Sequence, residues 1–187
     1  MTALTAYTTG GGGETTAYVY GVTTASGSGI DDNDVVAATV WPDPTTGAAS
    51  AGQEDVTTVD ALGKTVTSTD RNGTTHTLTY DVLGRVVSDA VTTLGSGVDG
   101  SVRRIDTAYD HQSNAYLVTS YDAASGGSMV NQVQDAYNGL GQLTTEWQAN
   151  SGSVNTSTTP KVPHAYDEMP SGDESRLGSV WDSTGVH

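Results

Sequence analysis

The stretch DALGKTVTSTDRNGTTHTLTYDVLGRV, residues 60–86, decides the fold, because one turn signature recurs in it three times. In each copy an aspartate stands three residues before a glycine: Asp60 and Gly63, Asp70 and Gly73, Asp81 and Gly84. Aspartate at the first position of a β-turn can accept a hydrogen bond from the backbone ahead of it, and glycine at the fourth can adopt positive φ without a Cβ clash. Such turns at short, regular intervals predict an antiparallel meander.

The register of this meander follows if each glycine forms a G1 bulge. Asp70 then pairs with Thr74, which sets Ser68 opposite His76. Successive side chains of a strand point to opposite faces, so one face should be apolar and the other should carry hydroxyls, as in a half-buried sheet. The apolar face would hold Val66, Leu78, Tyr80 and Val86, and the hydroxyl face Thr65, Thr67, Thr69, Thr75, Thr77 and Thr79.

The rest of the chain also predicts strands rather than helices. β-Forming residues cover 35–41, 101–109, 116–121, 129–137 and 142–148, and residues 1–29 predict an early hairpin punctuated by glycines. Pro42 and Pro44 are expected to end the strand 35–41, with a loop over 45–55. No window shows a convincing helical apolar stripe, so the predicted fold class is all-β.

A tyrosine directly before the turn residue marks the repeat. Tyr80, Tyr109, Tyr121, Tyr137 and Tyr166 each precede an aspartate or an asparagine. The marks at positions 81, 110, 138 and 167 are separated by 29, 28 and 29 residues, with Asp122 as an extra mark. Repeats of this kind bury their faces by stacking on neighbouring repeats.

The motifs YDVLGRV at 80–86 and YNGLGQL at 137–143 resemble the YD repeat of the RHS family, and residues 56–147 resemble it best. The resemblance implies a meander of β-hairpins in an open or curled sheet, as a fragment of a larger RHS or teneurin-like shell. Such shells are displayed or secreted and can enclose a toxin domain. The resemblance therefore implies an extracellular or cell-surface location. The implied partners are neighbouring YD repeats of a longer chain, with an enclosed toxin domain or a glycan.

Composition and charge exclude several classes of protein. Seven Lys and Arg stand against 22 Asp and Glu, a net charge of −15, which would repel nucleic acids and anionic membranes. The chain has no Cys and so no disulfide or thiol chemistry. No stretch approaches the roughly 18 apolar residues of a membrane span. The chain begins without a secretory signal, so it would be a fragment of an exported protein or a cytoplasmic relic.

Motifs that could carry chemistry are better explained as turns and strands. Residues 95–100, GSGVDG, match a dinucleotide fingerprint, but a strand is expected where the pyrophosphate site needs a helix. The acidic run 31–34 lacks the spacing of a calcium loop, and no two histidines are spaced for zinc. His76 is expected to pack beside Leu78. We expect no catalytic activity, no cofactor and no metal.

Three segments are expected: N-terminal hairpins over 1–55, the YD meander over 56–148, and a polar loop, degenerate repeat and frayed C-terminus over 149–187. Pro160 and Pro163 are expected to bar a central strand from the last segment, whose first part would be a long hairpin loop or disordered.

The predicted role is that of a structural or binding segment of an RHS shell, for enclosing cargo or for cell-surface interaction. The alternative is a carbohydrate-binding β module at a cell surface, whose tyrosine rings stack on sugar. The residues that we expect to carry these roles are the turn residues Asp60, Gly63, Asp70, Gly73, Asp81, Gly84, Asn138 and Gly141, and the wall or sugar-stacking residues Tyr80, Tyr109, Tyr121, Tyr137 and Tyr166.

Overall fold

The computed structural model of the chain describes residues 2–7, 12–166 and 177–180. These residues form thirteen β-strands and one short 3-10 helix, η1 (Thr24–Ser26), so the predicted all-β fold is confirmed. The strands are β1 (Thr2–Tyr7), β2 (Gly13–Val22), β3 (Asp32–Pro42), β4 (Ala49–Val59), β5 (Thr65–Thr69), β6 (Thr75–Tyr80), β7 (Val86–Thr93), β8 (Arg104–Tyr109), β9 (Ala115–Tyr121), β10 (Met129–Tyr137), β11 (Leu143–Ala149), β12 (Lys161–Tyr166) and β13 (Leu177–Val180).

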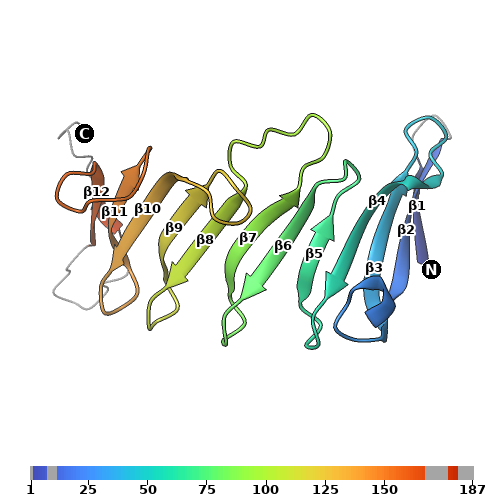
Figure 1. Cartoon of the computed structure of the whole chain (residues 1–187), viewed down its shortest axis with the longest axis horizontal. Coiled ribbons are helices and arrows are strands. Elements are labelled where there is room, and N and C mark those ends of the chain that lie inside the picture. Colours follow the sequence, from blue (N-terminus) through green and yellow to red (C-terminus); the bar gives the residue numbers. More distant parts are fainter. Residues whose placement is uncertain (1, 8–11, 167–176, 181–187) are drawn as a thin grey trace. The chain divides into compact units, whose positions relative to one another are not determined.

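The chain divides into two compact units. Unit 1 comprises Met1–Tyr80 and Asp89–Asp99, and unit 2 comprises Asp81–Ser88 and Gly100–His187. In unit 1 the strands β1 to β6 hydrogen-bond in sequence order, and in unit 2 the strands β8 to β13 do the same (Figure 1). Each unit is therefore an antiparallel meander, as the sequence predicts. The division into the segments 1–55, 56–148 and 149–187 stays a prediction.

The register predicted from the glycine bulge is confirmed in the β5–β6 hairpin. Ser68 pairs with His76, and the backbone N–H of Asp70 donates to the carbonyl of Thr74 at 2.9 Å. Gly73, with a φ of 82°, supplies the left-handed conformation that this bulge requires. A four-residue turn thus fixes which residues face each other across the whole hairpin.

Hydroxyl groups line one face of unit 1, and they bond to one another across the strands. The Oγ1 atoms lie 2.6 Å apart in Thr58 and Thr67, and 2.9 Å apart in Thr69 and Thr75. Thr65 does not belong to this face, and that prediction is wrong. It pairs with Val59 while Thr67 pairs with Thr58, and the adjacent residues of β4 point to opposite sides.

Few side chains are fully shielded from water in either unit. Apolar burial involves only alanine and valine among the described residues: Ala17, Val22, Ala38, Val40, Val59, Ala90 and Ala149. Side chains of this size fill the space next to a sheet but do not build a thick core against a second layer. The meanders are thus thin, in agreement with the low apolar content of the chain, 35%.

Two boundaries in unit 1 differ from the prediction, although β3 ends at Pro42, opposite Ala49, as expected. The strand begins at Asp32, three residues earlier than predicted. The expected loop over 45–55 is wrong from residue 49 on, because β4 begins there. The polar residues that suggested a loop are held by the neighbouring strand: Thr39 pairs with Asp55, whose carboxylate accepts a hydrogen bond from the Trp41 indole at 2.7 Å.

The prediction that prolines bar a central strand from 149–163 is also wrong. Pro163 lies in β12, which pairs with both β11 and β13. Pro163 stands opposite Thr145. Three pairs further along the two strands, the Gln148 N–H donates to the Pro160 carbonyl, so Gln148 and Pro160 form a hydrogen-bonded pair. Because hydrogen-bonded and non-bonded pairs alternate in an antiparallel ladder, Pro163 occupies a non-bonded pair with β11. Its missing N–H therefore removes no bond to that strand.

Some predictions fall outside the described residues. They concern residues 8–11 of the early glycine run, Asp167 of the last Tyr-Asp mark, His187, and the degenerate repeat and frayed terminus over 167–176 and 181–187.

Candidate functional site

Five turns of the described chain share one hydrogen-bonding pattern. The backbone N–H of the first residue donates to the carbonyl of the fifth, and the N–H of the fourth donates back to the carbonyl of the first. The side-chain Oδ1 of the first residue also accepts the N–H groups of the third and fifth residues at 2.8–3.0 Å. The first residues are Asp60, Asp70, Asp81, Asp110 and Asn138.

The fourth position of every one of these turns has positive φ. Glycine stands there in four turns, with φ of 78° at Gly63, 82° at Gly73, 80° at Gly84 and 75° at Gly141. Ser113, with a φ of 68°, takes the place of glycine in the Asp110 turn and is the one non-glycine residue with positive φ in the described part of the chain. Sequence reasoning placed a turn there but could not foresee a strained serine, because no glycine marks it.

The first and fifth side chains of a turn also bond to each other. In the first turn of unit 2, an Nη2 atom of Arg85 lies 2.6 Å from a carboxylate oxygen of Asp81. In the next, the Asn114 amide donates to Asp110 at 3.0 Å. Backbone hydrogen bonds from Arg85, followed by the Arg85 side chain, lower the pKa of Asp81, and hydrogen bonds from Asn114 lower the pKa of Asp110. These carboxylates therefore stay ionised with their donors supplied from within the turn.

Four tyrosine hydroxyls reach back to the preceding hairpin of the repeat. Each donates to a backbone carbonyl 15–23 residues earlier in the chain. The pairs are Tyr80 with Thr65 at 2.6 Å, Tyr109 with Val86 at 3.0 Å, Tyr137 with Ala115 at 2.9 Å, and Tyr166 with Leu143 at 2.9 Å. Ala115 and Leu143 are the residues directly opposite Tyr109 and Tyr137, so these two acceptors stand across from the preceding tyrosine. We refer to these contacts as the tyrosine chain.

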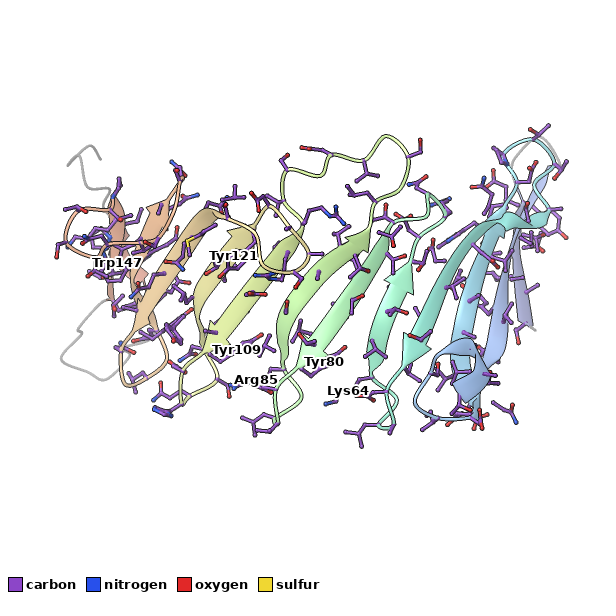
Figure 2. The ribbon with its side chains drawn as sticks, in the orientation of Figure 1. Lys64, Tyr80, Arg85, Tyr109, Tyr121 and Trp147 are labelled. Carbon is purple, nitrogen blue, oxygen red and sulfur yellow. The ribbon has the colours of Figure 1, made fainter. Side chains whose placement is uncertain are left out.

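Cationic side chains cover two rings of the tyrosine chain. The Lys64 ammonium lies 5.1 Å from the centre of the Tyr80 ring, and the Arg85 guanidinium lies 4.4 Å from that of Tyr109 (Figure 2). Both cations stand at the fifth position of one of the five turns, Lys64 in the Asp60 turn and Arg85 in the Asp81 turn. They therefore lie over the ring of the following repeat, where the electron-rich face attracts them.

Tyr121 does not belong to the tyrosine chain, although its Tyr-Asp motif looks the same in the sequence. It ends β9, whereas Ala115 at the other end of β9 follows the Asp110 turn. A longer turn follows Tyr121, closed by the Asp122 N–H donating to the Ser128 carbonyl at 3.1 Å. Its ring is covered by Arg104 at 4.1 Å. The Tyr121-Asp122 motif therefore lies at the other end of β9 from the Asp110 turn.

A second bulge, which sequence reasoning missed, stands beside Tyr109 and beside Tyr137. The pairing shifts by one residue between Ala108 and Tyr109, and again between Ala136 and Tyr137. The extra residue lies on the strand that follows the turn. In the β8–β9 hairpin it is Tyr116, which has no pairing partner on β8 because Ala108 pairs with Leu117 and Tyr109 with Ala115. A bulge adds one residue to a strand and so shifts the alternation of its side chains between the two faces of the sheet. A shift of this kind at Tyr116 was the one sequence feature that could have indicated the bulge.

The other candidate groups do not assemble into a reactive centre. The packing of His76 beside Leu78 stays a prediction, and the structure adds an Asp89 carboxylate oxygen 2.7 Å from the His76 Nδ1. Residues 95–100 lie in the loop between β7 and β8, and Asp32 opens β3. No group of three or more metal-ligating side chains exists within the described ranges. In the same part of the chain no helix is long and apolar enough to cross a membrane.

One group of buried polar atoms stands out in unit 2. Asp135 Oδ1, Trp147 Nε1 and His164 Nε2 are buried without a hydrogen-bond partner among the described residues. Asp135 pairs directly with Glu146 across β10 and β11, which places two carboxylates on one face. Burial, and then the charge of Glu146, raise the pKa of Asp135. Two carboxylates that face each other across a strand pair repel when both are ionised, so the pairing favours the protonated form of Asp135.

Comparison with known proteins finds structural likeness only. No protein-family model and no curated protein sequence matches the chain. A crystal structure of TcdB2-TccC3-Cdc42 is similar over 72% of this chain, with 16% identity and a TM-score of 0.33. A structure of TcdB2-TccC3 without its hypervariable C-terminal region is similar over 71%, with 15% identity and a TM-score of 0.32. A Photorhabdus luminescens Tc holotoxin pore with a substitution in TccC3 is similar over 72%, with 14% identity and a TM-score of 0.32.

The chain spans 8% of the length of each of these structures. At TM-scores of 0.32–0.33 these matches identify neither a family nor a role for the chain.

Proposed function

We propose that this chain is a structural segment of an RHS-type shell wall, which encloses cargo or takes part in cell-surface interaction and has no catalytic activity. Its partners would be neighbouring YD repeats of a longer chain and an enclosed toxin domain. Its location would be outside the cell or at the cell surface. The turn residues and the tyrosines named from the sequence would serve as corners and anchors of this wall.

The tyrosine chain is the observation that carries the proposal. Each hydroxyl joins one hairpin to the hairpin before it, as for Tyr137 and the Ala115 carbonyl at 2.9 Å. Bonds of this kind hold repeats in order without building a compact core. A protein whose stability is a sum of contacts between successive repeats suits an extended wall.

The thinness of the meanders also supports a wall. Neither unit buries a large apolar side chain, and the largest fully buried side chain among the described residues is that of Val22. A single layer of strands offers two faces, one toward an enclosed space and one toward the surroundings. An enzyme of this size usually needs a concave, largely preformed pocket, which thin sheets do not build.

Protease protection of the protein in its genomic context tests the proposal. The reading frame around this chain would be expressed whole and treated with protease before and after mild unfolding. A wall predicts that further Tyr-Asp hairpins flank residues 1–187 and that an internal segment resists cleavage until the repeats unfold. Flanking stop codons, or equal cleavage of all segments in the native state, would contradict it.

The carbohydrate-binding alternative receives less support. The hydroxyls of Tyr80, Tyr109, Tyr137 and Tyr166 bond to the backbone, and cations cover the rings of Tyr80, Tyr109 and Tyr121. Sugar stacking needs a free ring face. Tyr20 and Tyr116, with 44% and 37% of their surface exposed, are better candidates for it. Glycan-array binding that disappears in Tyr116→Ala but persists in Tyr109→Phe would favour this alternative.

A further inference from the structure

Two asparagines of the sequence stand directly before a glycine, and both lie in turns of the shared hydrogen-bonding pattern. Asn138 is the first residue of its turn and is followed by Gly139, whereas Asn72 is the third residue of the Asp70 turn and is followed by Gly73. In such a pair the glycine nitrogen can attack the side-chain Cγ of the asparagine, because glycine has no Cβ to obstruct the approach. The two pairs have the same residues but differ in how the fold holds the reacting atoms.

The attacking nitrogen is free in one pair and engaged in the other. The Gly73 N–H donates to the Asp70 carbonyl at 2.9 Å, which closes that turn. The Gly139 N–H has no hydrogen-bond partner among the described residues. The carbonyl of Asn138, in the same peptide group, accepts the Gly141 N–H at 3.0 Å. A donor on this carbonyl stabilises the negative charge that spreads over the peptide group when Gly139 loses its proton.

The side chain that is attacked is also prepared in the Asn138 turn. Asn138 Oδ1 accepts the N–H groups of Leu140 at 2.9 Å and of Gln142 at 3.0 Å. Attack on Cγ moves negative charge onto this oxygen, and two fixed donors stabilise the charge there, as in an oxyanion hole. Asn72 donates its backbone N–H to Asp70 Oδ1, but its side-chain oxygen accepts no hydrogen bond from the described part of the chain.

The surroundings of Gly139 leave room for a ring to form. Gly139 is exposed, and a Cβ added to it would meet no atom within 4 Å. Solvent water can therefore reach the peptide group between Asn138 and Gly139 from outside the turn. Nucleophile, oxyanion donors and water thus meet at this one peptide group.

We propose that Asn138 and Gly139 form a site of spontaneous deamidation, at which the fold promotes conversion of Asn138 to aspartate and isoaspartate without an enzyme. The Gly139 nitrogen bonds to Asn138 Cγ, its proton passes through water to the side-chain nitrogen, and ammonia leaves to give a succinimide ring. Water then opens the ring at one of its two carbonyl carbons. Cleavage between Cγ and the ring nitrogen gives aspartate, and cleavage of the original main-chain bond gives isoaspartate.

The aspartate product has a ready place in this repeat. Aspartate heads the other four turns of the same pattern, and in one of them the Asn114 amide donates to Asp110 at 3.0 Å. Isoaspartate instead lengthens the main chain by a methylene group and removes the Oδ1 acceptor from the turn. Deamidation therefore adds negative charge to unit 2 and divides the molecules into those that keep the turn and those that lose it. The inference goes beyond the proposed wall and does not depend on it.

Mass spectrometry of the full chain, aged at neutral pH in water labelled with a heavy oxygen isotope, tests the inference. Ring opening by labelled water marks each site that reacts during ageing, and digestion in unlabelled water assigns the label to Asn138 or Asn72. We expect the rate constant at Asn138 to exceed that at Asn72 by about fivefold or more. A protease that cleaves at aspartate but not at isoaspartate separates the two products.

The variant Gly139→Ala is the matched control, because its Cβ obstructs the attacking nitrogen while the turn has space for it. It should lower the rate constant at Asn138 by about tenfold or more and leave that at Asn72 unchanged. Circular dichroism checks that the variant folds. An unchanged rate at Asn138 in the folded variant would overturn the inference.

The unfolded chain separates the effect of the fold from that of the sequence. In guanidinium chloride at the same pH neither turn exists, so the two rate constants should become nearly equal. A ratio as large in the unfolded chain as in the folded one would overturn the inference. Equal or faster reaction at Asn72 in the folded chain, or no label at either site, would also overturn it.

Discussion

The phenolic hydroxyl of Tyr109 donates to the carbonyl oxygen of Val86 at 3.0 Å, and Val86 belongs to the hairpin that precedes Tyr109 in the repeat. The guanidinium of Arg85, next to Val86 in the chain, lies over the ring of the same tyrosine at 4.4 Å. One tyrosine is thus held by two consecutive residues of the previous repeat. Coupling between repeats in this chain passes through such pairs.

Replacing Tyr109 by Phe should lower the free energy of unfolding by about 0.5–1.5 kcal/mol, because the ring remains but the Val86 carbonyl loses a donor. Urea unfolding at neutral pH measures the change. Tyr116→Phe is the matched control, since Tyr116 is 37% exposed and its hydroxyl has no hydrogen bond to the described residues. Equal stability of the two variants would show that the tyrosine chain contributes nothing.

Two glycines of one turn should respond in opposite ways to alanine. Gly141 has a φ of 75°, so Gly141→Ala should destabilise the protein by about 1 kcal/mol through backbone strain. Gly139 is not in the left-handed region and has open space around an added Cβ. Gly139→Ala should therefore be neutral or stabilising by up to about 1 kcal/mol. Thermal unfolding compares them, and a larger loss in Gly139→Ala would contradict the turn geometry.

Asparagine should substitute for aspartate at the head of a turn, as Asn138 does naturally. Asp70 Oδ1 accepts the N–H groups of Asn72 and Thr74 at 2.8 and 2.9 Å, and an asparagine Oδ1 can accept both. Asp70→Asn should therefore leave the free energy of unfolding nearly unchanged. Asp70→Ala should lower it by about 1–2 kcal/mol, because two backbone donors lose their acceptor. A loss of equal size in both variants would indicate that charge, and not the acceptor, matters.

Acidification should first stabilise unit 2. Burial and the opposing Glu146 raise the pKa of Asp135 above its ordinary value of 3.8, while Tyr137 and His164 act weakly in the other direction. The folded state therefore binds a proton at a higher pH than the unfolded state does, and stability rises as the pH falls from neutral through the raised pKa toward 3.8. Unfolding in urea at several pH values measures this rise.

The variant Asp135→Asn provides the control for that pH dependence. Removing the carboxylate should stabilise the protein at pH 7 and flatten the rise on acidification. Below 3.8 the sign reverses in both proteins, because the turn aspartates Asp60, Asp81 and Asp110 have lowered pKa values and their stabilisation is lost as they are protonated. A rise of the same size in Asp135→Asn would show that another group is responsible.

Local chemistry allowed much of the fold to be predicted. An Asx residue and a glycine three positions apart close a turn with bonds made inside five residues, so the turns at Asp60, Asp70 and Asp81 could be read directly. The G1 bulge then fixed the pairing of Ser68 with His76 through geometry alone.

Contacts between strands determined the strand boundaries and tyrosine partners that could not be predicted from the sequence. Residues 49–55 look like a loop, but pairing with β3 makes them a strand, and Pro163 fits β12 because its nitrogen faces away from β11. The partners of the tyrosine hydroxyls lie 15–23 residues away. The second bulge beside Tyr109 and Tyr137 shifts the strand register next to these rings, and no residue type marks that bulge in the sequence.

The sequence by itself therefore determined where the chain turns and that it forms strands, because a turn is stabilised by atoms only a few bonds apart. Tertiary structure alone decided which tyrosines join repeats and which, like Tyr121, do not, because those bonds depend on the register of strands distant in the chain. It also decided that the leucines of the turns point into solvent, since exposure is a property of the folded sheet and not of the turn motif.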